Sequence, residues 1–460
     1  MIRPNNAADV SEAEAHLQAH PNTRFVEMVF TGMNGVSRGK RLRVHELAAM
    51  YRQGRFLPTS TLVADITGRD VERTGLVWDN GDADIVAWPI AGSLKPAPWL
   101  GDDCAQVAVM LHGLDGAPSP LDPRQVLQRV TAQFAQEGLT PVVACELEYY
   151  LVDAQRTHDG GIQLAPHHAS GERPVGHNTY GLRELEDVAP FLRELWSAAD
   201  AQDIPLEGAI SEYAAGQVEL TLRHRPDAVR AADDAVLYKR AAKGVAAKHG
   251  MEATFMAKPF ALSSGSGLHI HVSVLNTRGD NIFAGPLERP NLSLLHALGG
   301  MMQTMPAAMA VFAPNANSWR RFVSESYAPT SASWGLNNRT VSLRIPAGAD
   351  TTRHIEHRIS GADANPYLAV AAVLAGVLDG LRGKIDPGPA VCGNAYAATD
   401  VHKLPADWLS AIETFAGDAR IRAYLGADFV ENYAIVKRTE LSRFNAAVTP
   451  LDYDWYLRSA

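Results

Sequence analysis

Alternating polar and apolar residues mark several short strands along the chain, most clearly beyond residue 140. At 142–151, Glu146 and Glu148 share one face of a strand, because side chains two residues apart point the same way. Cys145, Leu147 and Tyr149 share the opposite face. The same alternation recurs at 216–222, 268–274, 340–345 and 355–359. We therefore expect an antiparallel sheet with one apolar face packed on helices and one polar face lining a wet site.

The rest of the chain predicts an α+β organisation. Alternating stretches indicate a small β-rich unit near the N-terminus, with strands at 24–30, 38–44, 82–89 and 105–111. Glycine, aspartate and proline crowd residues 113–123, which is typical of a linker. Helices are predicted at 123–137, 181–202, 225–249, 291–312, 364–382, 405–416 and 430–446. We therefore expect two domains, residues 1–115 and residues 116–460.

The polar faces of the strands beyond residue 140 carry an unusual set of side chains. They are glutamates, histidines and arginines without a lysine: Glu146, Glu148, Glu219, His269, His271, Arg344, Glu356 and Arg358. A solvated outer face is the simpler interpretation of any one strand, but such a face usually includes lysine. Carboxylates held close together repel one another unless cations neutralise them. Glutamates with one or two imidazoles suit Mg²⁺ or Mn²⁺ better than Zn²⁺.

Arginines and two loops extend this chemistry. The arginines suit an anion that shares the metals, and they are Arg321, Arg339, Arg344, Arg353 and Arg358. A polyphosphate is the usual such anion, so phosphoryl transfer from a metal-bound nucleotide is the leading hypothesis and a metal-dependent hydrolase is its rival. The glycine-bearing loop 263–267 lets backbone approach a ligand, and the irregular segment 315–334 is typical of a flap over a site.

Composition and charge limit the classes of binding partner and the cellular compartment that we expect. A chain of 460 residues with 46% hydrophobic and 20% charged residues is ordinary for a globular protein. A net charge of −9 lacks the basic excess of nucleic-acid-binding proteins, so we expect no nucleic-acid partner. No stretch approaches ~18 uncharged apolar residues, so we expect no membrane span. Three scattered cysteines without zinc or redox spacing favour a reducing cytoplasm.

Six ordered motifs resemble the glutamine synthetase family over nearly the whole chain. They are CELEYY (145–150), SEYAAGQVE (211–219), GSGLHIHVS (265–273), NSWRR (317–321), WGLNNR (334–339) with its continuation to Pro346, and RHIEHR (353–358). The resemblance implies a small N-terminal β-grasp domain and a larger catalytic domain with a curved antiparallel sheet backed by helices. It also implies a homododecamer of two stacked hexameric rings.

The resemblance assigns roles position by position. It implies one metal held by Glu148, Glu212 and Glu219, and another held by Glu146, His269 and Glu356. The residues implied for glutamate are Gly265, Arg321 and Arg358. The residues implied for ATP are His271, Ser273, Arg344 and Arg353. The residues implied to stabilise the transferring phosphoryl group are Arg339 and Arg344. The family makes an acyl phosphate from glutamate and ATP, and a nitrogen nucleophile then displaces phosphate.

The chain departs from glutamine-forming members where they hold ammonium. Tyr327 stands in place of their flap glutamate, and the run Phe56-Leu-Pro-Thr-Ser60 lacks their loop aspartate. A pocket without carboxylates binds the strongly hydrated ammonium ion poorly. An aromatic ring at position 327 instead suits the methylenes or the charge of an organic amine. The similarity is therefore greatest to γ-glutamylpolyamine (putrescine-type) synthetases.

We predict an ATP-dependent ligase that joins the γ-carboxyl of glutamate to a primary amine of the putrescine, spermidine or spermine class, through γ-glutamyl phosphate, in polyamine catabolism. The alternatives are a glutamine synthetase that uses ammonia, a ligase for a monoamine, and a non-catalytic relative. The group that deprotonates the amine stays open among Glu325, Tyr327 and Asp65. The choice of amine and the choice between Mg²⁺ and Mn²⁺ also stay open.

Overall fold

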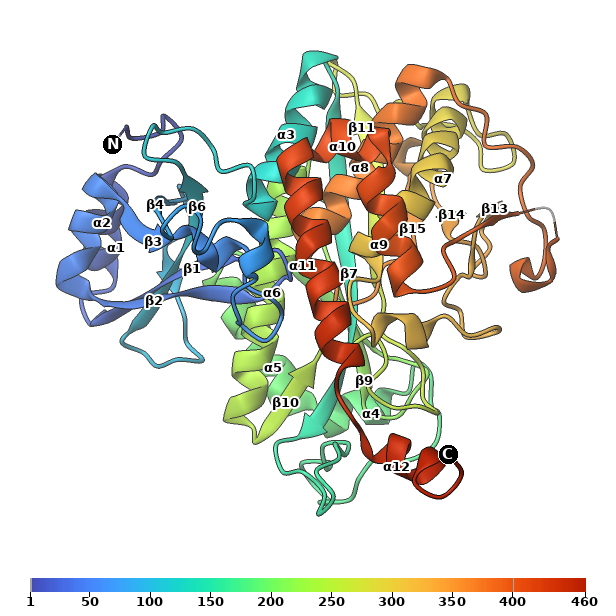
Figure 1. Cartoon of the computed structure of the whole chain (residues 1–460), viewed down its shortest axis with the longest axis horizontal. Coiled ribbons are helices and arrows are strands. Elements are labelled where there is room, and N and C mark those ends of the chain that lie inside the picture. The colour runs from blue at the N-terminus through green and yellow to red at the C-terminus, as the bar shows by residue number, and fades with distance from the viewer. Residues whose placement is uncertain (1, 400) are drawn as a thin grey trace.

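The computed structural model describes residues 2–399 and 401–460, and these residues form two large sheets in chain order and one two-stranded sheet (Figure 1). The first sheet has the order β2-β1-β6-β4-β3, with β5 paired to β6. Its strands are β1 (Phe25–Thr31), β2 (Ser37–Arg43), β3 (Arg55–Pro58), β4 (Asp84–Pro89), β5 (Lys95–Pro96) and β6 (Cys104–His112). Strands β1 and β6 run parallel. Beside this sheet lie α1 (Val10–Ala19) and α2 (Leu47–Gln53).

The second sheet has the order β13-β14-β15-β11-β7-β9-β8, with β10 paired to β7. Its strands are β7 (Thr140–Asp153), β8 (Leu206–Ser211), β9 (Gln217–Leu222), β10 (Met251–Thr254), β11 (Leu268–Leu275), β13 (Trp334–Leu336), β14 (Leu343–Ile345) and β15 (Ile355–His357). A two-stranded pair is formed by β12 (Ser331–Ala332) and β16 (His402–Lys403). The five strands that the alternation predicted pair antiparallel with one another, as expected. Strand β13, which was not predicted, runs parallel to β14 at the edge of the sheet.

Helices pack behind the apolar face of the second sheet, some on its strands and others on those helices. They are α3 (Pro123–Gln136), α6 (Ala228–Lys248), α7 (Leu292–Phe312), α8 (Pro366–Gly383), α9 (Trp408–Gly417), α10 (Ala419–Leu425) and α11 (Ala427–Asn445). Helices α3 and α6 pack directly on β7, and α7 packs along α8. Cys145, Leu147 and Tyr149 are all 0% exposed, which confirms the face that the alternation assigned to them.

One predicted helix divides into two. The stretch predicted as 181–202 forms α4 (Leu182–Asp187) and α5 (Ala189–Ala201), which are separated by Val188. Pro190 stands in the first turn of α5. A proline lacks an N–H and clashes with the carbonyl four residues before it, so a helix that arrives from 182 cannot continue through this position.

Among the described residues, α8 is the one helix that is long and apolar enough to cross a membrane by length and composition. Within the fold 78% of it is buried, and it packs against α3, α6 and α7. A buried core helix passes such a test as readily as a membrane span does.

Buried polar contacts join the first sheet to α11. Lys437 is 0% exposed, and its Nζ donates to Glu440 Oε2 at 2.9 Å and to Asn34 Oδ1. Glu440 Oε1 accepts a hydrogen bond from the backbone N–H of Ile66 at 2.8 Å. These contacts fix the loops of the first sheet against the last long helix. The division into domains at residues 115 and 116 stays a prediction.

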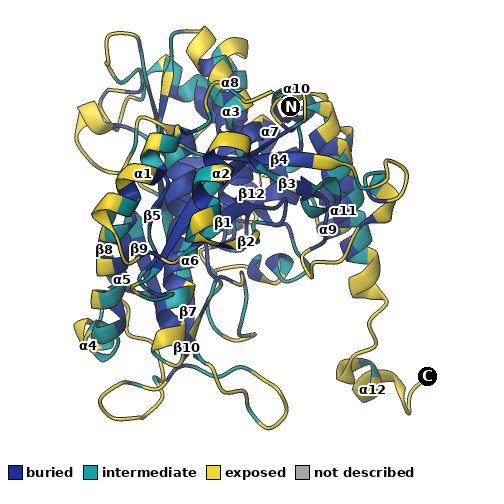
Figure 2. Cartoon of the chain, turned by 90° about the vertical axis from the view of Figure 1, so that its left-hand side faces the viewer, coloured by how far each residue is buried: buried dark blue, intermediate teal, exposed yellow. Residues whose placement is uncertain are grey.

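The last helix is α12 (Pro450–Tyr456), which extends away from the body and is exposed at every residue except the half-buried Asp452 (Figure 2).

Candidate active site

The strand register places predicted site residues opposite one another. Glu146 lies opposite His269 where β7 pairs with β11. Glu148 lies opposite Glu219 where β7 pairs with β9. Side chains directly opposed in an antiparallel pair have Cβ atoms about 4.5–5.5 Å apart, so each pair can share a ligand. The alternation along β7 therefore directs both of its glutamates to the same face as their partners.

Five residues meet on this face as two overlapping groups. Glu146, His269 and Glu356 form one group, and Glu148, Glu219 and His269 form the other, with one ligand atom from each residue within 4.8 Å of the rest. His269 belongs to both, because its Nδ1 lies 3.4 Å from Glu146 Oε2 and its Nε2 lies 3.8 Å from Glu148 Oε1. We call these five residues the carboxylate cluster. It contains five of the six predicted metal ligands.

Glu212, the sixth predicted ligand, lies outside both groups. It follows the end of β8, and its backbone N–H donates to Gln217 O at 3.0 Å. Burial and the negative charge of Glu148 raise the pKa of Glu212 to about 7. Glu212 is therefore within electrostatic reach of the cluster, although its carboxylate is not placed among the ligand atoms.

One end of the cluster is short of positive charge. Burial raises the pKa of Glu219 well above its ordinary value, and the charges of Glu146, Glu148 and Glu212 raise it further. The raised pKa means that neighbouring carboxylates repel the charged form of this side chain. A bound cation relieves that repulsion as a proton does. The donor set of several carboxylates and one imidazole fits a hard divalent cation.

The other end of the cluster already has positive charge. Burial raises the pKa of Glu356, but the charge of Arg358 and of the nearby histidines outweighs it and brings this pKa down to about 2. Glu356 forms ion pairs with Arg358 and with Arg344, whose Nη1 lies 2.8 Å from Glu356 Oε2. Arg344 Nη2 also donates to Asn337 Oδ1 at 2.8 Å. Two arginines therefore stand beside the cluster, whereas Arg339, which was predicted with Arg344 to stabilise the phosphoryl group, is exposed.

The residues predicted to bind glutamate lie next to one another. Arg321 is buried, and its Nη1 donates to Ile359 O at 2.8 Å while its Nη2 donates to Arg358 O at 3.3 Å. A Cβ at Gly265 would lie 2.6 Å from Arg321 Cγ, so only glycine allows this approach. The same loop reaches the cluster, because the N–H of Gly267 donates to Glu148 Oε2 at 2.7 Å.

The residues predicted to bind ATP are divided between two places. His271 and Ser273 are buried on the polar face of β11, and His271 Nε2 lies 3.1 Å from an oxygen of the cluster. Arg353 instead donates to the carbonyl of Gly285 at 3.0 Å and to Asp350 Oδ1 at 2.9 Å. The structure therefore does not bring Arg353 to the cluster, and its role toward a nucleotide stays a prediction.

The predicted flap carries two strained residues. Glu325 and Tyr327 have φ values of 61° and 57°, in the left-handed region that non-glycine residues rarely adopt. Both are exposed, and Tyr327 is 61% exposed. The hydroxyl of Tyr396 donates to Ala328 O at 3.0 Å and so anchors this segment. The sequence did not predict this contact, because the two residues lie far apart in the chain.

Asp65, the third candidate for the proton-accepting group, is fully engaged elsewhere. Its Oδ1 accepts from the backbone N–H groups of Thr67 at 2.8 Å and Arg69 at 2.9 Å, and its Oδ2 pairs with Arg443. Glu325 and Tyr327 are therefore the candidates with exposed side chains.

Two histidines beside the cluster were also missed. His354 Nε2 lies 3.1 Å from His271 Nδ1, and His224 lies against both rings. Burial, followed by the charge of His271, lowers the pKa of His354 to about 4. His354 could have been found, since it stands two residues before Glu356 and shares its face. His224 lies in a loop beyond β9, where the two-residue alternation has ended and the sequence does not indicate which way a side chain points.

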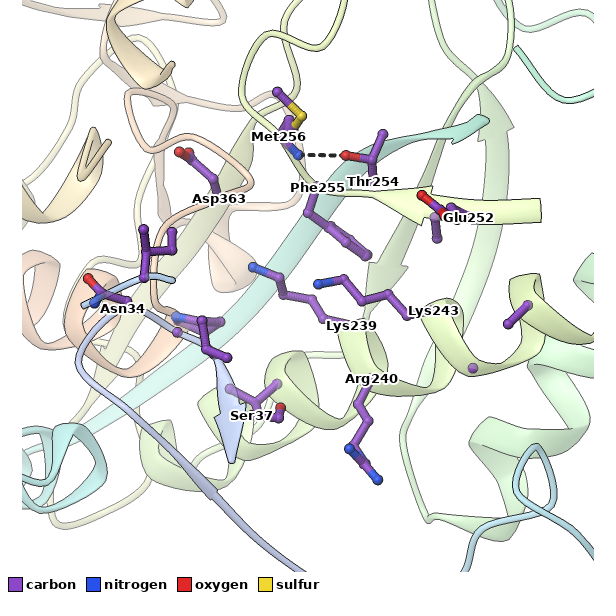
Figure 3. Close-up of a pocket in the computed structure, with 18 of the residues that line it drawn as sticks. Asn34, Ser37, Lys239, Arg240, Lys243, Glu252, Thr254, Phe255, Met256 and Asp363 are labelled. Atoms are coloured by element: carbon purple, nitrogen blue, oxygen red, sulfur yellow. Dashed lines mark hydrogen bonds between the residues drawn. The ribbon is translucent and has the colours of Figure 1, made fainter. Parts of the chain in front are cut away.

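A large cavity lies apart from this site. It measures about 910 Å³ and is lined by loop residues of the first sheet, by α6 and by β10 (Figure 3). Lys239 and Lys243 of α6 extend into it beside Phe255. Lys239 Nζ donates to Ala362 O at 2.7 Å, and burial lowers its pKa to about 7. None of the predicted site residues lines this cavity.

Comparisons with known proteins agree with the resemblance. The model of the glutamine synthetase catalytic domain matches residues 120–456. A gamma-glutamylputrescine synthetase of Escherichia coli (strain K12) is 39% identical over 99% of this chain and 96% of its own length. A glutamate–isopropylamine ligase of Pseudomonas sp is 35% identical over 86% of this chain and 85% of its own. A solved GmaS/ADP complex superposes with a TM-score of 0.83 at 28% identity, covering 96% of this chain and 98% of that one.

Proposed function

The chain belongs to the glutamine synthetase family, and from that premise we propose that it is an ATP-dependent ligase joining the γ-carboxyl of glutamate to a primary amine of a polyamine. The observation that carries the proposal is the meeting of the carboxylate cluster with Arg344 and Arg358 at Glu356. Carboxylates that can bind metal ions thus lie beside two guanidinium groups that can bind a phosphate. Phosphoryl transfer requires both. The relatives that are named as amine ligases support an organic amine as the acceptor.

The cluster would hold the cations that the family uses, and we propose Mg²⁺ or Mn²⁺. The residues that would hold them are Glu146, Glu148, Glu219, His269 and Glu356, with Glu212 beside them. Such cations supply neutralisation of the charge that develops on the γ-phosphoryl group of ATP.

The chain's own residues would bind and orient the two anionic substrates. Arg339 and Arg344 would contact the phosphoryl group, and the buried Arg321 and Arg358 would hold glutamate with the backbone of Gly265. His271, Ser273 and Arg353 would contact the rest of the nucleotide. Glutamate becomes an electrophile once its γ-carboxylate carries the phosphoryl group. The segment 315–334 would cover the site, because water would hydrolyse this intermediate.

The second step explains the choice of nitrogen. The amine attacks the γ-carbonyl carbon, the carbon–oxygen bond to phosphate breaks, and the ammonium proton passes to a base. An amine with a pKa near 10 must lose this proton, as lysine does. Glu325 and Tyr327 are the exposed candidates on the segment that would cover the site. Tyr327 in place of a carboxylate favours an alkyl amine over ammonium.

The test is release of phosphate by the purified chain with glutamate and ATP, supplied in turn with putrescine, spermidine, isopropylamine or ammonium. We expect the largest kcat/KM with a polyamine. A kcat/KM for ammonium equal to that for any amine would show a glutamine synthetase, and preference for isopropylamine would show a monoamine ligase. Absence of phosphate release with every nitrogen source would indicate a non-catalytic relative.

Three further properties belong to the same proposal. We propose a homododecamer of two hexameric rings, a cytoplasmic location, and separate domains at residues 1–115 and 116–460. Light scattering on the eluted protein would test the first, because a dodecamer has twelve times the 49.6 kDa mass of one chain.

A further inference from the structure

Three histidines converge beside the carboxylate cluster, from three separate parts of the chain. His224 follows β9, His271 lies on β11 and His354 precedes β15. Their ring centroids are 5.1–5.8 Å apart, and one nitrogen from each ring lies within 4.8 Å of the other two. We call them the histidine triad. No role predicted from the sequence includes His224 or His354.

Two contacts set how the rings lie. His354 Nδ1 lies 2.8 Å from the carbonyl oxygen of Thr352, which accepts a hydrogen bond. His271 Nε2 lies 3.1 Å from a carboxylate oxygen of Glu146. The two remaining nitrogens, His354 Nε2 and His271 Nδ1, face each other at 3.1 Å.

Two imidazole nitrogens at this distance can share a proton or bind one metal ion. Imidazole nitrogens bind Zn²⁺ at about 2.0–2.1 Å, so a tetrahedral ion holds two of them about 3.4 Å apart, a few tenths of an ångström beyond the present separation. The triad adds a third imidazole and needs no large rearrangement.

The third ring completes a donor set that differs from the cluster. His224 is exposed, whereas His271 is buried and His354 is half-buried, so the triad is open to solvent on one side. Three neutral imidazoles with an open fourth position suit Zn²⁺, Co²⁺ and Ni²⁺, whereas Mg²⁺ prefers oxygen donors. The two neighbouring sites therefore differ in the class of cation that each selects.

We propose that His224, His271 and His354 form a third cation site, selective for divalent d-block ions with an affinity for imidazole. The site shares His271 with the residues proposed to contact ATP, so its test measures metal binding and not turnover. It adjoins the cluster through the contact of His271 with Glu146.

The test uses Co²⁺ as the probe, on the full chain in saturating Mg²⁺. Four-coordinate Co²⁺ with imidazole ligands absorbs visible light strongly, whereas six-coordinate Co²⁺ among carboxylates absorbs weakly. We expect a strong band that saturates at one equivalent per chain and is displaced by Zn²⁺. His354→Ala and His224→Ala should each lose the band and weaken Zn²⁺ binding at least about tenfold in equilibrium dialysis.

The matched control is His158→Ala, which removes an exposed histidine away from the triad and should keep the band. His224 is exposed, so its replacement tests the site even where the His354 variant fails to fold. A wild-type spectrum with only weak bands would mean that a proton alone lies between the rings, and it would overturn the proposal. A strong band that survives both triad substitutions would overturn it too.

Discussion

The change Glu219→Gln tests the electrostatics of the carboxylate cluster, because it removes one charge and keeps the shape of the side chain. Burial and neighbouring acids raise the pKa of Glu219 above its unfolded value. A carboxyl group whose pKa is raised by folding has no effect on the free energy of unfolding below about pH 4.5, the pKa of an unfolded glutamate. The free energy of unfolding then falls as the pH rises toward the pKa of the folded state. The metal-free wild-type chain should therefore become less stable than the glutamine variant with rising pH.

The size of the effect follows from the geometry. The ligand atoms of Glu148 and Glu219 lie within 4.8 Å of each other, and two charges at that distance repel by about 3.5 kcal/mol at an effective dielectric of about 20. The linkage between proton binding and folding gives an upper limit of similar size: one carboxyl group can lower the free energy of unfolding by at most about 3.4 kcal/mol between pH 4.5 and pH 7. Because the entropy of unfolding is about 2.1 cal/mol/K per residue, this chain should show a difference in melting temperature of about 3.5 °C.

The assay is thermal unfolding of both proteins with a chelator present, from pH 5 to pH 8, and then in excess Mg²⁺. We expect the variant to melt higher above pH 6 without metal. Mg²⁺ at about 100 times its Kd should stabilise the wild type by about 2.7 kcal/mol and the variant by less, so the difference between their melting temperatures should shrink. Glu288→Gln, at an exposed glutamate, is the control and should follow the wild type. A variant that is less stable than wild type at pH 8 without metal, or a difference independent of pH, would refute the reasoning.

Three further changes test the other contacts. Tyr327→Glu should raise ammonium use relative to putrescine by about tenfold or more, since a charged hydrogen bond contributes about 1.5–3 kcal/mol; an unchanged ratio in the phosphate assay would count against the flap argument. Arg344→Lys should lower kcat on the order of 100-fold, because lysine cannot span both of its present partners; near-normal turnover would remove it from the site. Lys437→Ala should cost about 3–5 kcal/mol in urea unfolding by leaving Glu440 buried and unpaired, whereas the exposed Lys403→Ala should cost little.

Local patterns predicted the cluster well for a physical reason. The alternation along a strand fixes the face of every side chain, so Glu146 and Glu148 could be assigned to the polar face and Cys145 to the core without knowledge of the neighbouring strands. The alternation did not predict which residues pair across strands: the family resemblance grouped Glu146 with His269, and the structure places them opposite each other. The break near Val188 was missed because the apolar periodicity continues across it.

Contacts between distant segments were out of reach of such patterns. Asp65 was considered as a base, but its partner Arg443 lies 378 positions away in the chain. Arg353 belongs to a motif, yet its guanidinium turns to Gly285, which the motif does not include. Glu212 lies just beyond the end of β8, where the two-residue period no longer fixes direction.

Strand β7 has a consequence for how this chain can change over evolution. It is 14 residues long and is paired with β9, β10 and β11, so its position is set from both sides. Deleting one residue ahead of Glu146 would turn every later side chain of β7 to the opposite face, and would exchange its acids with Cys145 and Leu147. Descendants can therefore alter this strand by substitution only, while gains and losses of length are confined to exposed connections such as 154–181.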